Sequence, residues 1–389
     1  MELKKRITVL SPSFALTSIL SLAPAITSIA AAFPETSTSM VQTLTTLPSL
    51  IAIPVILISG RLSTITTKKR IVTASLVLML LGGLAPLLFH SRFSQLMAAA
   101  VVFGLGYGGI SPLTTALIHE HYSQGEQPMM LGLQSAVIGV GGALFSFLGG
   151  RLAAVRWWYA YFAFLLFLPI LLLVLMLPRG ETAPRAAGRT GGISPRLLLY
   201  AGQAIVYCVF LYIFQTSIAL LVAGRGLGGA EVSGRILSVQ SVFSILSGVL
   251  GGVILTRLGR YSLPVIFGGT AASLLIAYLA GGVLPLFVSA AVLGFFFALR
   301  MPAGYLKATQ SVPPAAATMA IAFYCSASQA GQFLSPAVVG WLSGLLGIGL
   351  ERRFLLGGVC LTVLAVLSAV WEWWQAAEVR RSPASGPLA

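Results

Sequence analysis

The chain has 389 residues, of which 57% are hydrophobic and only 8% are charged, and its formal net charge is +15. Soluble domains carry about 25% charged residues, so this composition excludes a soluble globular protein. The basic residues lie in short segments between long apolar runs rather than on one arm or face, which argues against a nucleic-acid-binding protein.

Apolar runs of about twenty residues, long enough to cross a bilayer as a helix, recur along the whole chain. Their hydropathy predicts twelve membrane-spanning helices. The predicted ranges are 8–32, 38–60, 71–90, 94–118, 129–153, 157–178, 197–222, 232–256, 262–283, 285–308, 316–344 and 354–377. The N-terminus is similar to a signal peptide, but its apolar part is too long for one, so we interpret 8–32 as an uncleaved first helix.

A polar segment rich in Pro, Gly and Arg, residues 179–196, lies between the sixth and seventh predicted helices and is typical of a linker. It divides the chain into two predicted six-helix bundles, 1–178 and 197–389. Most of the 24 Lys and Arg residues fall on the side of the linker, so the positive-inside rule places both termini in the cytoplasm. We expect an integral protein of a bacterial cytoplasmic (inner) membrane, with the lipid bilayer as its surroundings.

The two predicted bundles are similar in sequence. At one constant offset, VVFGLGYGGISP (101–112) aligns with AVLGFFFALRMP (291–302). The same offset pairs three glycines of the first half with three of the second: Gly104 with Gly294, Gly141 with Gly331, and Gly150 with Gly340. Such a repeat is found in many secondary transporters, in which a central site lies between the halves.

With twelve predicted helices, a basic linker and a glycine- and arginine-rich loop after the second and eighth helices, the chain resembles the major facilitator superfamily. The residues that carry the loop resemblance are Gly60, Lys68, Lys69, Arg70, Gly252, Arg257, Gly259 and Arg260. The resemblance implies an all-α polytopic membrane protein, with two pseudo-symmetric bundles around a central cavity, that works as a monomer. Thr64 and Thr256 stand where the family has an aspartate, so the charge relay that this aspartate supports is not expected.

Arg300 lies inside the tenth predicted helix, where a charge costs about 2.5–3.5 kcal/mol on insertion scales. The resemblance implies that this helix lines the cavity, where an unpaired arginine would bind a carboxylate, sulfate or phosphate group. The alternative is that Arg300 snorkels to the inner interface. Polar side chains of other helices are candidates to complete the site: Thr17, Tyr207, Tyr212, Gln215, Gln240, Tyr324, Gln329 and Gln332.

No glutamate falls in the predicted centre of the bundle, which disfavours proton antiport through a buried carboxylate. Glu372 lies near the cytoplasmic end of the last helix, which the resemblance makes peripheral, and Lys307 is expected at the same interface. The exporter pattern of the family is incomplete, since Ala100 and Phe145 replace the expected arginine and glycine. Glu35, near the outer end, is a reserve candidate for a titratable group.

We therefore expect a secondary transporter that moves a small organic solute, anionic or amphipathic, by rocker-switch alternating access. The alternatives are a multidrug or metabolite exporter driven by proton antiport, and a lipid-handling protein with the same fold. The sequence has neither a P-loop nor a cluster of metal ligands, so we expect no enzyme activity, no cofactor and no metal. Cys208, Cys325 and Cys360 lack paired spacing and are expected to be buried thiols.

Overall fold

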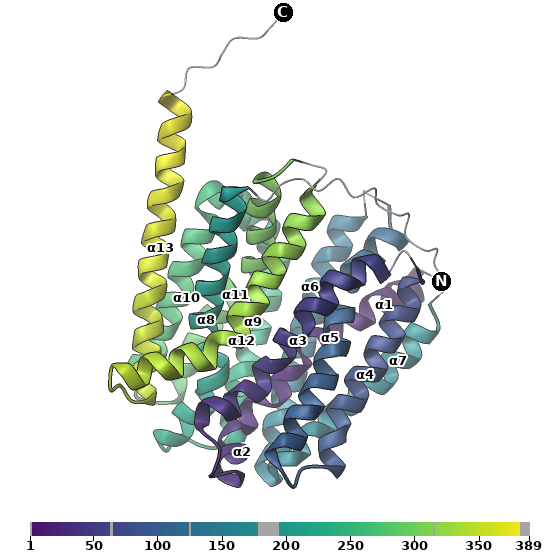
Figure 1. Cartoon of the computed structure of the whole chain (residues 1–389), viewed down its shortest axis with the longest axis vertical. Helices are drawn as coiled ribbons and strands as arrows, with labels where there is room; N and C mark the ends of the chain where they lie inside the picture. Colours follow the sequence, from purple (N-terminus) through teal and green to yellow (C-terminus); the bar gives the residue numbers. More distant parts are fainter. Residues whose placement is uncertain (1, 63–64, 124–125, 178–193, 314–315, 382–389) are drawn as a thin grey trace, which may run out of the picture.

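The computed structural model describes residues 2–62, 65–123, 126–177, 194–313 and 316–381, and its regular secondary structure there is entirely helical (Figure 1). Thr64 and residues 179–193 of the predicted linker lie outside the described residues. The elements of the first half are α1 (Glu2–Leu10), η1 (Ser11–Ser21), η2 (Ala23–Ala25), α2 (Ile26–Ala32), α3 (Thr38–Leu62), α4 (Lys68–Leu88), α5 (Phe93–His121), α6 (Gln127–Val155), η3 (Trp157–Leu166) and α7 (Phe167–Leu175). Those of the second half are α8 (Pro195–Gly224), α9 (Ala230–Leu258), η4 (Gly259–Tyr261), α10 (Ser262–Leu279), α11 (Val283–Gln310), α12 (Ala317–Leu345) and α13 (Leu350–Arg381).

Ten stretches of the described residues are long and apolar enough to cross a membrane. One of them, 230–279, holds both α9 and α10, whereas α12 is not among them. The glutamine and serine side chains along α12 explain its lower hydropathy. Every predicted range overlaps helical structure, but the predicted number of twelve spans is not confirmed.

The first predicted helix, 8–32, is interrupted. The chain there passes through α1, η1, η2 and α2, and Pro12 and Pro24 stand at the starts of the two 3₁₀ segments. Proline lacks the N–H group that an α-helix interior needs, so it favours a break at these points. The sixth range likewise divides into η3 and α7. Each range still forms one candidate membrane span, 5–32 and 157–175, but neither is a regular α-helix throughout.

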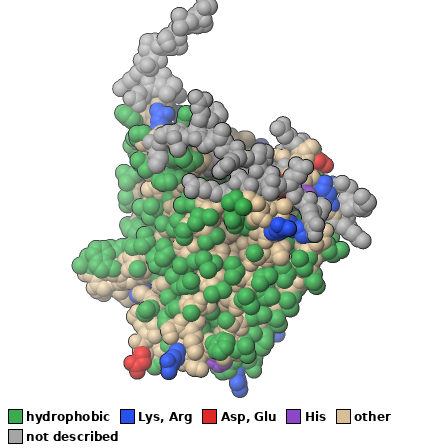
Figure 2. Space-filling view, turned by 45° about the vertical axis from the view of Figure 1, so that its right-hand side comes forward, with side chains coloured by type: hydrophobic (Ala, Val, Ile, Leu, Met, Phe, Trp, Pro, Cys, Tyr) green, Lys and Arg blue, Asp and Glu red, His purple; other side chains and the backbone are tan. Residues whose placement is uncertain are grey.

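The outer face of the helical bundle is apolar. Figure 2 shows hydrophobic side chains over most of the visible face, with Lys and Arg side chains toward its two ends. Leu81, Leu172, Val249 and Leu367 are each more than half exposed. A soluble protein would bury most of such a surface, whereas lipid tails solvate it.

Two clusters of buried apolar residues form the interior. One contains Phe145, Phe164 and Phe167 and draws its members from α1 to α7. The other contains Phe214 and Phe267 and, apart from Ala23, draws its members from α8 to α13. Helices α6 and α9, and helices α3 and α12, pack across the boundary between the clusters.

The two clusters meet tightly at the end of the molecule opposite the linker. We call this the opposite end, and we call the end where α7 finishes and α8 begins the linker end. A Cβ atom added to Gly150 on α6 would lie 2.9 Å from the Cα of Gly234 on α9, so only glycine permits this approach. Beside it, Arg151 pairs with Glu231 at 2.7 Å. Gln42 on α3 donates hydrogen bonds of 2.9 Å to the Thr216 carbonyl and the Ser217 hydroxyl on α8.

Candidate functional site

Arg300 lies in the interior of the bundle on α11, and only 8% of its surface is exposed. Its Nη1 atom lies 3.5 Å from the Sγ of Cys208 on α8 and 3.8 Å from the Sδ of Met301. The guanidinium group stands 4.7 Å from the ring centre of Phe297, one turn earlier on its own helix. Sulfur atoms and an aromatic face are weak partners for a cation.

No carboxylate among the described residues pairs with Arg300. Its Nε atom is buried and has no hydrogen-bond acceptor. Burying an arginine without a partner lowers the stability of the protein. An unsatisfied buried donor costs about 1–3 kcal/mol, and a charged donor costs more. The site therefore has a donor group that a bound acceptor would satisfy.

Two residues of α11 near Arg300 affect how the helix packs. Pro302 removes one backbone donor inside the helix. Gly304, one turn after Arg300, faces the ring of Tyr324 on α12, and any side chain at Gly304 would overlap that ring. The glycine therefore brings Tyr324 to the guanidinium group. The ring of Tyr305 lies 6.0 Å from that of Tyr324, edge to face.

Five tyrosines surround Arg300 closely enough to interact with its charge. They are Tyr107 on α5, Tyr207 and Tyr212 on α8, Tyr305 on α11, and Tyr324 on α12. Tyr107 comes from the first half of the chain and also lies beside Gln329 of α12. Both halves thus contribute to this region, which we call the Arg300 site.

Several buried amides of α8, α9 and α12 have unsatisfied polar atoms. The Nε2 atoms of Gln215 and Gln329 are buried donors without an acceptor, and the Oε1 atom of Gln240 is a buried acceptor without a donor. Gln332 is also buried. Buried polar groups without a partner are rare in folded proteins. Of these amides, Gln329 lies beside Tyr107 and so belongs to the Arg300 site.

Two of the predicted site residues are engaged elsewhere. The hydroxyl groups of Tyr207 and of Thr270 on α10 share a hydrogen bond of 2.8 Å, so this part of Tyr207 points into the second cluster. Thr17 donates a hydrogen bond of 3.0 Å to the Ile138 carbonyl and ties η1 to α6. These contacts give both side chains a structural role.

The first motif loop connects α4 to its neighbours. Lys68 pairs with Glu120 on α5 at 2.9 Å, and Lys69 donates to the carbonyls of Leu175 and Leu177 at 2.7 and 2.5 Å. Lys69 thereby satisfies backbone acceptors at the C-terminal end of α7. Gly60 lies in the last turn of α3, and Arg70 is exposed.

The second motif loop makes fewer contacts with other helices. Thr256 donates hydrogen bonds to the carbonyls of Gly252 and Val253 in its own helix, so it does not cap a neighbouring helix. Gly259 ends α9 with a φ of 51°, a conformation that favours glycine. Arg257 is exposed. Arg260 lies over the ring of Tyr261, 4.9 Å from its centre.

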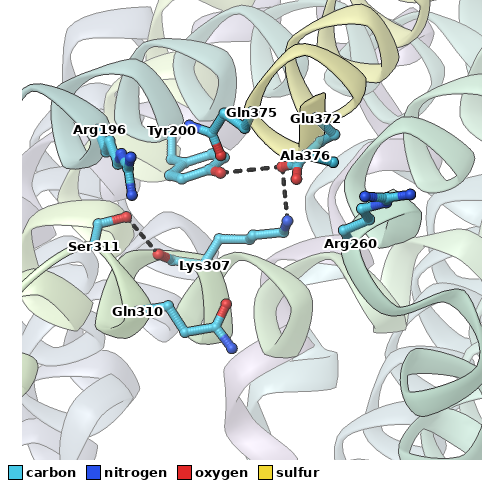
Figure 3. A pocket seen from close by; sticks show the side chains of 9 residues that line it. All are labelled: Arg196, Tyr200, Arg260, Lys307, Gln310, Ser311, Glu372, Gln375 and Ala376. Carbon is cyan, nitrogen blue, oxygen red and sulfur yellow. Dashed lines mark hydrogen bonds and ion pairs between the residues drawn. The ribbon is translucent and has the colours of Figure 1, made fainter. Parts of the chain in front are cut away.

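A buried ion pair lies at the linker end, two turns along α11 from Arg300. The Nζ of Lys307 lies 2.7 Å from the Oε1 of Glu372 on α13, and the hydroxyl of Tyr200 on α8 donates to the same oxygen at 3.0 Å (Figure 3). Lys307, which the sequence predicts at the inner interface, is buried here, with 7% of its surface exposed. Glu372 is 4% exposed. Glu35, the reserve candidate, is exposed.

Comparisons with known proteins agree with this architecture. A sequence profile described as Major Facilitator Superfamily matches residues 8–283. No match was found among curated proteins. Among solved structures, the POT family transporter PepTSo has a TM-score of 0.76 at 10% identity, with 95% of this chain and 97% of that chain covered.

Two further solved structures are similar. The nucleoside transporter NupG has a TM-score of 0.75 at 13% identity, with 94% of this chain and 99% of that chain covered. A D-xylose-proton symporter has a TM-score of 0.73 at 14% identity, with 94% and 96% covered. At these identities the likeness concerns the fold alone.

Proposed function

The chain belongs to the major facilitator superfamily and is a membrane transporter rather than an enzyme, and we propose that it moves a small organic anion across the bilayer by alternating access. The observation that carries this proposal is Arg300, a buried guanidinium group without a carboxylate partner in the part of the chain that the structure describes. A carboxylate, sulfate or phosphate group of the solute would supply the missing charge.

The surroundings of Arg300 favour an organic rather than an inorganic anion. The ring of Phe297 supplies apolar surface next to the guanidinium group, and the charge of Arg300 acts on the hydroxyl groups of Tyr212 and Tyr324. Ligand sites of this kind combine an apolar lining with a few polar groups that orient the ligand. The amide of Gln329, which lies beside Tyr107 of the Arg300 site, would bind a further oxygen atom of the solute.

The packing of the helices supports alternating access. We propose that the chain forms two six-helix bundles, 1–178 and 197–389, with twelve spans and both termini in the cytoplasm. The paired glycines support the repeat, because Gly150 faces α9 of the second half and its counterpart Gly340 faces Ser39 on α3 of the first half. With the opposite end closed by these contacts, the solute would enter and leave the Arg300 site from the linker end.

A proton-coupled exporter is the second candidate. Glu372 supports it, because this buried carboxylate lies within a candidate span and is a titratable group of the kind that coupling requires. Under this alternative, Glu372→Gln would abolish transport driven by a pH gradient while solute binding at Arg300 remained. Under anion transport without proton coupling, the same variant would keep its response to the solute gradient.

Thermal unfolding of the purified chain with a panel of organic anions, cations and neutral amphipaths tests the proposal. A ligand that binds only the folded state at one hundred times its Kd adds about 2.7 kcal/mol of stability. We expect organic anions to raise the Tm of the parent and not that of Arg300→Gln. Stabilisation of both proteins to the same extent, by cations or by anions, would overturn the assignment of Arg300.

Arg353→Gln is a matched control. Like Arg300, Arg353 has buried nitrogen atoms without a hydrogen-bond partner, in its case Nε and Nη1. Arg353 lies on α13 near the opposite end, away from the Arg300 site. We expect this variant to keep the response to anions. Arg300→Lys keeps the charge and loses the two parallel donors of the guanidinium group, so we expect a weakened response rather than none.

A further inference from the structure

A polar cavity lies at the linker end, away from the Arg300 site. It has a volume of about 430 Å³ and is formed by residues of α8, η4, α11 and α13 (Figure 3). The lining residues that carry the argument are Arg196, Tyr200, Arg260, Lys307 and Glu372. We call it the linker-end pocket. Three of its side chains are cations and one is an anion, so the lining carries an excess of two positive charges.

The single anion of the linker-end pocket is paired through one of its two oxygens, Oε1. Glu372 receives hydrogen bonds from Lys307 at 2.7 Å and from the Tyr200 hydroxyl at 3.0 Å. Arg196 and Arg260 have no carboxylate partner among the residues that the structure describes. Figure 3 shows the two arginines on either side of the ion pair. The free charges of the pocket are thus two guanidinium groups that flank a buried lysine.

Two tryptophans beside the pocket indicate its depth in the membrane. Trp373 and Trp374 follow Glu372 directly on α13, and they are 63% and 50% exposed. Exposed tryptophans near the end of a membrane helix lie at the boundary between the lipid tails and water. Basic pockets between helices at this level attract anionic headgroups. The opening of the pocket is therefore within reach of a lipid phosphate.

We propose that the linker-end pocket binds a phosphate-bearing group, held by Arg196 and Arg260 with Lys307 behind them. Guanidinium groups bind phosphate oxygens through two parallel hydrogen bonds, which makes them suited to this role. The group would come from the headgroup of an anionic lipid or from a soluble phosphate compound. The site is distinct from the proposed transport site, because it lies about two helical turns from Arg300 and shares no lining residue with it.

Native mass spectrometry and thermal unfolding of the purified full chain test this proposal. One arm adds phosphatidylglycerol, with phosphatidylcholine as the zwitterionic comparison. The other arm adds inorganic phosphate, with chloride at the same ionic strength. The proteins are the parent, the double variant Arg196→Gln/Arg260→Gln, and the control Arg257→Gln, which removes an exposed charge three residues from Arg260.

We expect phosphatidylglycerol to bind the parent and Arg257→Gln with equal affinity and to bind the double variant at least about tenfold more weakly. Binding of inorganic phosphate with the same dependence on the two arginines would support the pocket and identify a soluble phosphate as its source. Equal binding of phosphatidylglycerol to all three proteins, or no preference over phosphatidylcholine together with no phosphate binding, would overturn the proposal. The variant Arg196→Lys/Arg260→Lys keeps both positive charges, so it must retain part of the phosphatidylglycerol binding. It thereby distinguishes loss of charge from misfolding as the cause of weaker binding.

Discussion

Lys307 on α11 and Glu372 on α13 form an ion pair of 2.7 Å in which the two side chains are only 9% and 4% exposed. The residues are 65 positions apart in the sequence, so the contact ties two helices together rather than stabilising one. Tyr200 on α8 joins the same carboxylate and adds a third helix. Three helices of the second half therefore meet at this buried charge cluster.

Removing one partner of this pair is expected to destabilise the protein more than removing both. Lys307→Met leaves a buried carboxylate without its cation, and Glu372→Gln leaves the buried lysine without its anion. Either change should cost on the order of 3 kcal/mol. The double variant Lys307→Met/Glu372→Gln should recover a large part of that loss, as measured by chemical denaturation in detergent. Additive effects of the two changes would show that the pair is not coupled.

Gln42 on α3 is expected to hold the opposite end closed. Its amide donates to the Thr216 carbonyl and the Ser217 hydroxyl on α8. Gln42→Leu should lower stability by about 1–3 kcal/mol, because it leaves buried acceptors unsatisfied. Thr43→Val is the matched control, since the Thr43 hydroxyl donates only to the Ser39 carbonyl of its own helix. A similar loss in both variants would contradict a role for Gln42 between helices.

Gly150 is expected to permit the contact between α6 and α9. A Cβ atom there would lie 2.7 Å from the Ala230 carbonyl oxygen, so Gly150→Leu must push the helices apart. Overpacking of this kind costs about 1–3 kcal/mol. We expect amide hydrogen exchange at the opposite end of both helices to become about tenfold faster or more. Gly202→Leu is the control, because nothing lies within 4 Å of a Cβ atom added to Gly202. In this variant, amide exchange at the opposite end of α6 and α9 should not change.

Lys69 is expected to stabilise the first half through the end of α7. Its amine donates to the carbonyls of Leu175 and Leu177, whereas Arg70 beside it is exposed. Lys69→Met should therefore lower the free energy of unfolding by about 1.5 kcal/mol, at the lower end for charged hydrogen bonds because the amine is partly exposed. Arg70→Met should change it by less than about 0.5 kcal/mol. Equal effects in a thermal unfolding experiment would contradict this role of Lys69.

The helices could be predicted from the sequence, because membrane helices need long apolar runs. Each predicted range overlaps a helix of the structure. The change from α-helix to 3₁₀-helix within the first predicted range was harder to predict. Pro12 and Pro24 allow a break, but prolines are also tolerated inside membrane helices, as Pro302 shows in α11. Whether a proline interrupts a helix depends on how neighbouring helices satisfy the freed backbone groups.

The candidate site could be predicted only in part. Arg300 stands out in any apolar run, but Tyr107 does not, because uniformly apolar helices carry little information about which face points inward. Its aligned position in the repeat is Phe297, whose ring also lies against Arg300. This shared position is a signal that the sequence already contained. The pairing of Lys307 with Glu372 left no such signal, because it depends on how α11 and α13 are placed in space.

The most direct test of the central claim is uptake of radiolabelled mono- and dicarboxylates by proteoliposomes that contain either the parent chain or Arg300→Gln. If Arg300 anchors the solute, the parent takes up at least one of these anions, and Arg300→Gln does so at least about tenfold more slowly, since a charged hydrogen-bonded contact is lost. Arg353→Gln should match the parent. Uptake by Arg300→Gln at the rate of the parent would contradict the claim that Arg300 binds the transported anion.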